Sequence, residues 1–192
     1  AVDEVIVRMA FTLNAAGDIL ADTSNIIDSF RLILNGETVT CQAAPRMTLA
    51  DFLRQVIGLT ATHIGCEHGV CGACTVYVDG RIARACLMFA VQADGREVVT
   101  LEGLAEDRRM QVLQRHFHAR NALQCGFCTG GMLLTVHHHL EEGALPSRQE
   151  VRDYLSGNYC RCTGYHAIVD AVVEAAGELS AGEPVGGEEQ GC

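Results

Sequence analysis

Eight of the ten cysteines in this chain fall into two groups of four with short internal spacings. Four thiolates that converge can hold a metal ion or cluster, and the bound metal then stabilises the small fold around it. A chain of 192 residues can form two small domains, so we expect one metal centre in each. The first group is Cys66, Cys71, Cys74 and Cys86, and the second is Cys125, Cys128, Cys160 and Cys162.

The first group has the spacing of a plant-type 2Fe-2S loop. Four residues separate its first two cysteines, two separate the next two, and eleven more precede Cys86. A loop around a cluster needs backbone angles that a Cβ atom obstructs, and Gly65, Gly69 and Gly72 supply that freedom. A zinc site or a set of disulfides is the alternative, but the spacing and the glycines favour a cluster.

The second group matches neither zinc fingers nor ordinary ferredoxins, because thirty-one residues separate its two close pairs. Apolar residues recur at helical spacing after each pair, so both pairs are expected near helix N-termini. The positive end of a helix dipole suits an oxidised cluster, whose charge with four thiolates is about −2. Spacing alone leaves structural zinc open. The apolar residues are Met132, Leu133, Val136 and Leu140, then Ile168, Val169, Val172, Val173 and Ala176.

The pattern around the two groups predicts an α+β chain. Two hairpins are expected at residues 30–41 and 75–85, around an Asn-Gly and an Asp-Gly turn. Thr48 is expected to cap a helix, and residues 97–101 to form the last strand of a β-grasp fold like that of plant ferredoxins.

A four-helix domain is expected to follow. Ser147 and Glu150 form a capping box, and Gly157 is placed to end that helix before Cys160. The expected organisation is an N-terminal extension with a possible strand or hairpin (1–29), a ferredoxin-like 2Fe-2S domain (30–101), a helical 2Fe-2S domain (102–181) and a disordered tail (182–192).

Three long motifs resemble those of one known family, the small iron-sulfur subunits of the molybdenum hydroxylases, which include xanthine, aldehyde and carbon monoxide dehydrogenases. The resemblance covers roughly residues 31–180. One departure is Gly130, which stands where the family usually has proline and loosens the first turn of a helix. The motifs are HIGCE with GVCGACTV at residues 63–76, QCGFCTGG at residues 124–131 and GNYCRCTGY at residues 157–165.

The resemblance implies an oxidoreductase subunit that performs no substrate chemistry itself. A large subunit would hold a molybdenum-pterin cofactor, and a medium subunit would hold FAD. Electrons would pass from molybdenum through the Cys125 group and then the Cys66 group to FAD. The family further implies that Gln124 hydrogen-bonds the pterin and that the Cys162 sulfur lies next to it. A dimer of such heterotrimers is possible, and the substrate would be chosen by the large subunit.

The remaining cysteines and the histidines carry no recognisable constellation. Cys41 is expected to be a buried thiol on a strand, and Cys192 a loose terminal one. His68 lies inside the first loop, whose four cysteines already complete a ligand set. Three consecutive histidines at residues 137–139 point in different directions on a helix, so we expect them at a polar surface or subunit contact.

The formal charge of −10 argues against nucleic acid and anionic membranes as partners. No run of eighteen apolar residues indicates a membrane span. Cytoplasm is the expected location, with the periplasm as the alternative. Two other functions remain open at this point: a free-standing carrier with two clusters, which would be a monomer with both clusters covered, and a zinc-stabilised interaction module, which would be colourless.

Overall fold

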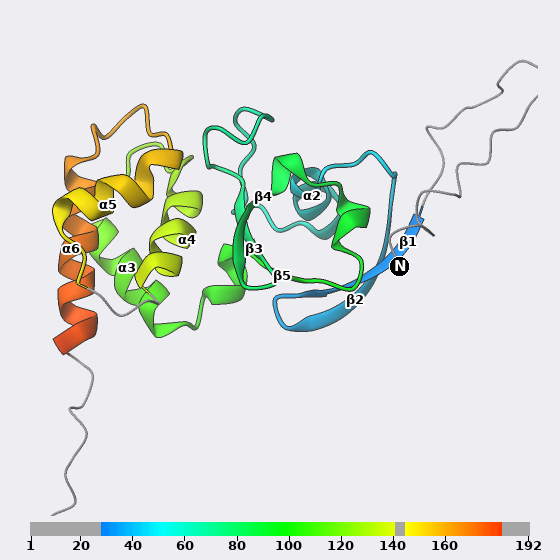
Figure 1. Ribbon diagram of the computed structural model, residues 1–192, viewed down its shortest axis with the longest axis horizontal. Coiled ribbons are helices and arrows are strands. Elements are labelled where there is room, and N and C mark those ends of the chain that lie inside the picture. The colour runs from blue at the N-terminus through cyan, green and yellow to red at the C-terminus, as the bar shows by residue number, and fades with distance from the viewer. Residues whose placement is uncertain (1–27, 141–144, 182–192) are drawn as a thin grey trace, which may run out of the picture.

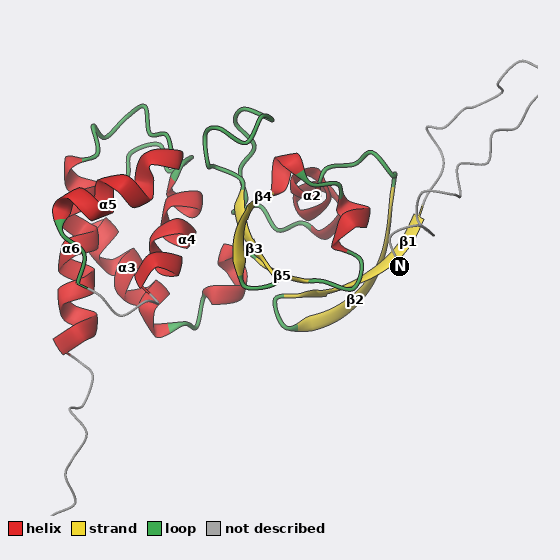
Figure 2. Ribbon diagram, viewed as in Figure 1, coloured by secondary structure: helices red, strands yellow, loops and turns green. Residues whose placement is uncertain are grey.

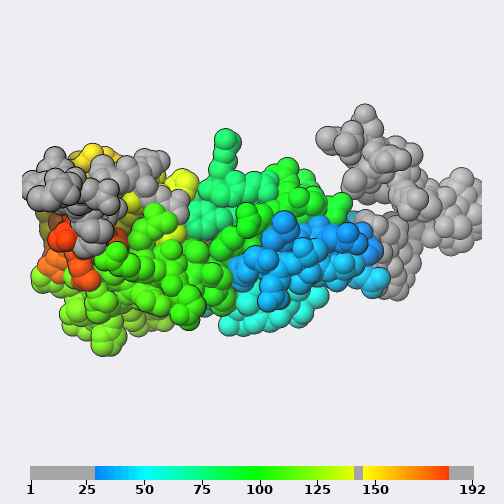
Figure 3. All heavy atoms as spheres, turned by 90° about the horizontal axis from the view of Figure 1, so that it is seen from below, coloured from blue at the N-terminus to red at the C-terminus, as the bar shows by residue number. Residues whose placement is uncertain are grey.

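The computed structural model describes residues 28–140 and 145–181. The expected N-terminal extension therefore lies outside the described residues, except that residues 28 and 29 belong to the first strand, and the expected tail lies outside them too. A strand-rich part and a helical part lie side by side (Figure 1). Seen from below, the two parts form one continuous body (Figure 3).

The strand-rich part is a five-stranded mixed sheet (Figure 2). Its strands are β1 (Asp28–Leu34), β2 (Glu37–Ala43), β3 (Thr75–Val78), β4 (Arg81–Arg84) and β5 (Glu97–Val99), in the order β2-β1-β5-β3-β4. Only β1 and β5 pair in parallel within this sheet. Both predicted hairpins are confirmed, because the Asn-Gly and Asp-Gly turns have the positive φ angles that two-residue hairpin turns require.

Strand β5 ends two residues earlier than predicted. Thr100 leaves the ladder and donates its backbone N–H to Asn35 Oδ1 at 2.8 Å, in the turn of the first hairpin. A 3-10 turn then covers Leu101–Leu104. The change from strands to helices falls in this turn, and we keep residue 101 as the proposed domain boundary.

The helix that begins at Leu49 and the 3-10 turn Ala90–Ala93 belong to the core of the strand-rich part, whereas α4 (Thr129–Leu140) of the helical part packs against β3 and β4. Thr48 caps the helix at Leu49 as predicted, because its Oγ1 accepts a hydrogen bond from the Asp51 N–H at 3.0 Å. The α-helical turn α2 (Leu49–Asp51) continues as a π-helical turn over Phe52–Ile57, which no sequence signal predicted. Phe52 is fully buried and packs against Phe30 of β1, with ring centroids 5.2 Å apart. This contact anchors the helix to the sheet ahead of the first cysteine loop.

The helical part contains the four predicted helices, α3 (Arg108–Ala119), α4 (Thr129–Leu140), α5 (Arg148–Tyr154) and α6 (His166–Ala181). The capping box at Ser147 and Glu150 is confirmed. A 3-10 turn over Leu155–Gly157 extends α5, so the helical segment ends at Gly157 as predicted. Gly157 does not have the left-handed φ of a glycine cap, however. Among the described residues, no helix is long and apolar enough to cross a bilayer.

The prediction that the histidines of α4 lie at a polar surface or subunit contact is wrong for His137. Its side chain is 2% exposed, because it lies on the face of α4 that packs against β3. The Nδ1 atom lies 2.9 Å from the Tyr77 hydroxyl and Nε2 lies 3.1 Å from Asp107 Oδ1. His139 instead stacks on Tyr154 with ring centroids 3.9 Å apart. The rings of His137 and His138 both lie beside Tyr77, with centroids 6.0 and 5.8 Å from its ring, so these two do not diverge as expected.

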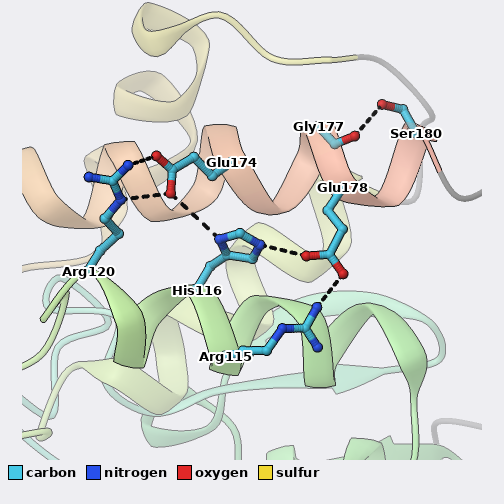
Figure 4. Close-up of polar contacts among 7 residues, drawn as sticks. All are labelled: Arg115, His116, Arg120, Glu174, Gly177, Glu178 and Ser180. Carbon is cyan, nitrogen blue, oxygen red and sulfur yellow. Dashed lines mark hydrogen bonds and ion pairs between the residues drawn. The ribbon is translucent and has the colours of Figure 1, made fainter.

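Helices α3 and α6 are joined on the outside by ion pairs (Figure 4). The His116 ring lies between two carboxylates of α6, with Nε2 2.9 Å from Glu178 and Nδ1 3.7 Å from Glu174. Arg115 pairs with Glu178 and Arg120 with Glu174. The arginine and glutamate side chains are exposed, so the apolar contacts beneath them contribute more to the stability of the helix pair.

Candidate metal centres

The first cysteine group lies on the loop that enters β3 and on the turn that follows β4. Gly69 and Gly72 have φ angles of 77° and 75°, so the predicted need for left-handed backbone is met at both. Gly65 acts differently from the prediction. Its φ is not positive, and a Cβ there would lie 3.2 Å from the Cys71 sulfur. Gly65 therefore keeps space beside a candidate ligand.

Backbone amides point at the sulfurs of this group, as expected. Cys66 Sγ accepts from the N–H groups of Cys71 and His68, both at 3.4 Å, and these bonds lower the pKa of Cys66 to about 6. Burial raises the pKa of Cys74 to about 12, although the Cys86 N–H lies 3.5 Å from its sulfur. A buried thiol of this kind ionises only beside a strong positive charge, which ferric ions would supply. The donor set therefore fits a cluster.

The second group joins the loop before α4 to the loop before α6. The sulfurs of Cys125 and Cys162 lie 3.6 Å apart on the exposed side of the site. Cys128 and Cys160 lie on the inner side, where burial raises the pKa of Cys128 to about 12. Burial also acts to raise the pKa of Cys160, but hydrogen bonds from Thr163 and its neighbours lower it overall.

Both pairs of the second group precede a helix, as predicted. Helix α4 begins at Thr129, directly after Cys128, and α6 begins at His166, four residues after Cys162. The free N–H groups and positive dipole ends of the two helices therefore lie near the four thiols. An anionic cluster is the kind of group that such a site favours.

The described side chains form no compact single-ion site. Over residues 28–140 and 145–181, no three Cys, His, Asp or Glu side chains converge tightly enough to hold a single metal ion. Zinc is held by four ligands around one ion, whereas a 2Fe-2S cluster spreads its four ligands over two irons.

The two cysteine loops touch each other at a contact that we call the loop interface. It consists of residues 71 and 72 from the first loop, Gly131 of α4, and residues 157–159 ahead of Cys160. The Tyr159 N–H donates to the Cys71 carbonyl at 2.9 Å, and Asn158 Nδ2 donates to the Gly72 carbonyl at 3.2 Å. A direct hydrogen bond therefore links a candidate ligand of one group to the neighbour of a candidate ligand of the other.

Glycine permits this close approach. A Cβ on Gly131 would lie 2.1 Å from the Gly72 carbonyl oxygen, and one on Gly72 would lie 2.4 Å from the Gly157 carbonyl oxygen. Gly130 also has a reason to be small, because its Cβ would lie 2.8 Å from the Ala61 carbonyl oxygen. Sequence reasoning missed the loop interface. Two adjacent glycines in the first turn of a helix lower its stability unless a close contact requires them. This unfavourable pair was the signal in the sequence that could have indicated the loop interface.

An aromatic contact adds to the same junction. Phe127, between Cys125 and Cys128, stacks on His63 near the first loop, with ring centroids 4.6 Å apart. Neither residue was singled out from the sequence. The contact brings the Cys125–Cys128 segment against the entry to the first cysteine loop, and it therefore fixes the two candidate centres relative to each other.

Gln124 lies on the exposed side of the second group. Its Nε2 donates to the Cys162 carbonyl at 3.1 Å, so the carboxamide is tied to the other pair of the group and not to its own loop. Exposed apolar side chains surround each group: Leu123, Phe127 and Tyr159 at the second, and Val70, Leu87 and Phe89 at the first. Exposed apolar groups of this kind are typical of protein interfaces.

The other candidate residues lie apart from the two groups. Cys41 is half-buried on β2, where burial raises its pKa, and it belongs to neither group. His68 is exposed in the first loop. Cys192 lies outside the described residues.

Comparison with known proteins agrees with this geometry. Residues 32–103 match the family described as 2Fe-2S iron-sulfur cluster binding domain, and residues 100–173 match a second family, 2Fe-2S binding domain. The chain is 49% identical to caffeine dehydrogenase subunit gamma of Pseudomonas sp. (strain CBB1), over 73% of this chain and 86% of that protein.

Two further relatives give the same result. The nicotine 6-hydroxylase small subunit of Paenarthrobacter nicotinovorans is 49% identical, over 76% of this chain and 88% of that protein. Among solved structures, quinoline 2-oxidoreductase from Pseudomonas putida 86 has a TM-score of 0.76 and 49% identity, covering 81% of this chain and 96% of that one.

Proposed function

This chain belongs to the small iron-sulfur subunits of the molybdenum hydroxylases, and on that premise we propose that it relays electrons between two partner subunits. The donor is a molybdenum-pterin cofactor in a large subunit, and the acceptor is FAD in a medium subunit. This chain contributes the path between them and no substrate chemistry. The hydrogen bond between the two cysteine loops carries this proposal.

We assign all eight cysteines as cluster ligands. A 2Fe-2S cluster supplies a centre that accepts and releases one electron at a time. Hydrogen bonds from two backbone N–H groups to the Cys66 sulfur favour its thiolate form. The burial of Cys74 excludes water from the inner side of the site. The ligands are Cys66, Cys71, Cys74 and Cys86 for one cluster, and Cys125, Cys128, Cys160 and Cys162 for the other.

The path inside the chain runs through the loop interface. From Cys160 it follows one peptide bond to Tyr159, whose N–H donates to the Cys71 carbonyl at 2.9 Å. Only covalent bonds and this hydrogen bond separate a ligand of one group from a ligand of the other. The contact supports a transfer step between the two groups, and the direction proposed, from the Cys125 group to the Cys66 group, is the one that the family resemblance implies.

Gln124 and Cys162 are proposed to meet the pterin. A carboxamide offers both a donor and an acceptor to the pterin edge, and a thiolate sulfur can accept from its amino group. The hydrogen bond from Gln124 to the Cys162 carbonyl supports this role, since it holds the two residues together on the exposed side of the second group.

The apolar groups beside each centre are proposed to be docking surfaces. Leu123 and Phe127 would contact the large subunit, and Val70 and Leu87 would contact the medium subunit. A free-standing carrier would instead keep both centres covered. A cytoplasmic location completes the proposal.

Isolation from the native host tests the assignment. We expect a coloured complex with about four irons per copy of this chain and two distinct paramagnetic resonance signals after reduction, because each 2Fe-2S centre takes up one electron. Sequencing the accompanying chains should identify a molybdenum-pterin subunit and a FAD subunit. A single-chain protein with two clusters would indicate the free-standing carrier, and a colourless zinc protein would contradict the proposal.

Replacing Gln124 by alanine tests the pterin contact. We expect substrate-driven bleaching of the clusters to slow by about tenfold, the value of one hydrogen bond, while dithionite reduces them at the normal rate. Gln114→Ala, on the exposed side of α3, is the matched control. Equal rates in all three proteins would remove Gln124 from the proposal without affecting the cluster ligands.

A further inference from the structure

The Arg84 guanidinium contacts both sides of the junction between the two cysteine loops. The Arg84 side chain leaves β4 two residues before Cys86 and is half-buried. Its Nη2 donates to the Gly157 carbonyl at 2.9 Å, and its Nη1 donates to Thr75 Oγ1, next to Cys74. The guanidinium therefore bridges the first ligand group and the segment that leads to Cys160.

The surroundings of Arg84 are built to accept a guanidinium. The Thr75 hydroxyl donates to the Gly72 carbonyl at 2.6 Å, which leaves its oxygen free to accept from Arg84. Gly157 has no side chain, and a Cβ there would lie 2.9 Å from Nη2. The two terminal nitrogens of the guanidinium are thus held by two neutral oxygens, Thr75 Oγ1 on one side of the loop interface and the Gly157 carbonyl on the other.

In the described part of the chain, no carboxylate pairs with this charge. Within residues 28–140 and 145–181, no Asp or Glu lies within ion-pair distance of Arg84, whereas Arg96, Arg115, Arg120 and Arg148 each have one. A guanidinium that donates to neutral oxygens keeps its positive charge, as Arg54 also does with the Thr60 and Thr62 carbonyls, and a negative group nearby then interacts with it favourably. The two ligand groups provide that group once they hold clusters.

We propose that Arg84 is a charge-tuning residue, whose guanidinium raises the reduction potential of the cluster held by Cys66, Cys71, Cys74 and Cys86. The inference rests on the proposed ligand roles. Reduction adds one electron to a site whose charge is already about −2, so a nearby fixed cation stabilises the reduced form more than the oxidised form. Arg161 lies between two ligands of the other group but is exposed, so solvent screens its charge.

Replacing Arg84 by glutamine tests this role in the full chain, isolated with its accompanying subunits. We expect the equilibrium constant for reduction of the Cys66-group cluster to fall by about tenfold, which is a shift of about 59 mV for one electron. The measurement is a redox titration that follows each paramagnetic signal separately. Iron content and visible absorption establish first that both clusters are present, so a failure of the ligand assignment is recognised separately.

Two further variants separate charge from structure. Arg84→Lys keeps the charge and should keep a potential near that of the unaltered protein. Arg81→Gln removes an exposed charge from the same strand and should also leave the potential unchanged. An unchanged potential in Arg84→Gln, or an equal shift in Arg81→Gln, overturns the proposal. Loss of the clusters in both Arg84 variants would show that Arg84 serves assembly alone, and would overturn it as well.

Discussion

Replacing Cys128 by serine is expected to remove the cluster of the second group and to leave the first in place. Cys128 is half-buried, and burial already raises the pKa of its thiol to about 12. A serine hydroxyl is far harder to ionise than a thiol and is a poorer ligand for iron in this setting. The first group lies on separate loops around β3 and β4, so its ligands and their amide donors remain.

The measurements for Cys128→Ser are iron content, paramagnetic resonance and turnover. Iron should fall from about four to about two per chain, and one of the two signals should disappear. Reduction of the natural acceptor by substrate should fall by at least about a hundredfold, because the path loses one of its two centres. Near-normal turnover with a missing signal would contradict the proposed path.

Cys41→Ser is the matched control for this variant. Cys41 is also a half-buried thiol, but it lies on β2 and belongs to neither ligand group. We expect both signals, the full iron content and normal turnover. Loss of a cluster in this control would mean that cysteine replacement disturbs the fold in general, and the effect of Cys128→Ser would then lose its meaning.

Local signals in the sequence predicted most of the elements that carry the cysteines. The Asn-Gly and Asp-Gly turns, the Thr48 cap and the Ser147 capping box depend only on residues close together in the chain. Both pairs of the second group do precede helices, because apolar periodicity identifies a helix and the pair stands directly before it. The family motifs added the functional context that spacing alone left open.

The contacts between the two parts could not be predicted in the same way. His137 was expected at a surface, and nothing in three consecutive histidines shows which one will face β3. Arg84 and Gly157 are seventy-three residues apart, and their hydrogen bond depends on how two separately formed units dock. Sequence patterns identify the two centres, whereas their mutual placement depends on long-range packing.

Replacing Gly131 by alanine is expected to damage the loop interface. Alanine is normally the better helix former, by up to about 1 kcal/mol. Here its Cβ would lie 2.1 Å from the Gly72 carbonyl oxygen, a backbone atom that cannot move without displacing Cys71. Overpacking of this kind costs about 1–3 kcal/mol, so the melting temperature should fall by roughly 2–12 °C. Transfer between the two clusters should slow as well, because the loops are pushed apart.

Gly177→Ala is the same substitution at another helical position, and here we expect no loss of thermal stability. Gly177 lies in α6, and a Cβ there would meet nothing within 4 Å. Helix propensity alone then acts, so this variant should be equally stable or more stable by up to about 1 kcal/mol. Thermal unfolding followed by visible absorption compares the two variants directly. If Gly131→Ala proves as stable as Gly177→Ala, the close approach at Gly72 does not limit the packing. The placement of the two centres must then depend on other contacts, such as the stacking of Phe127 on His63.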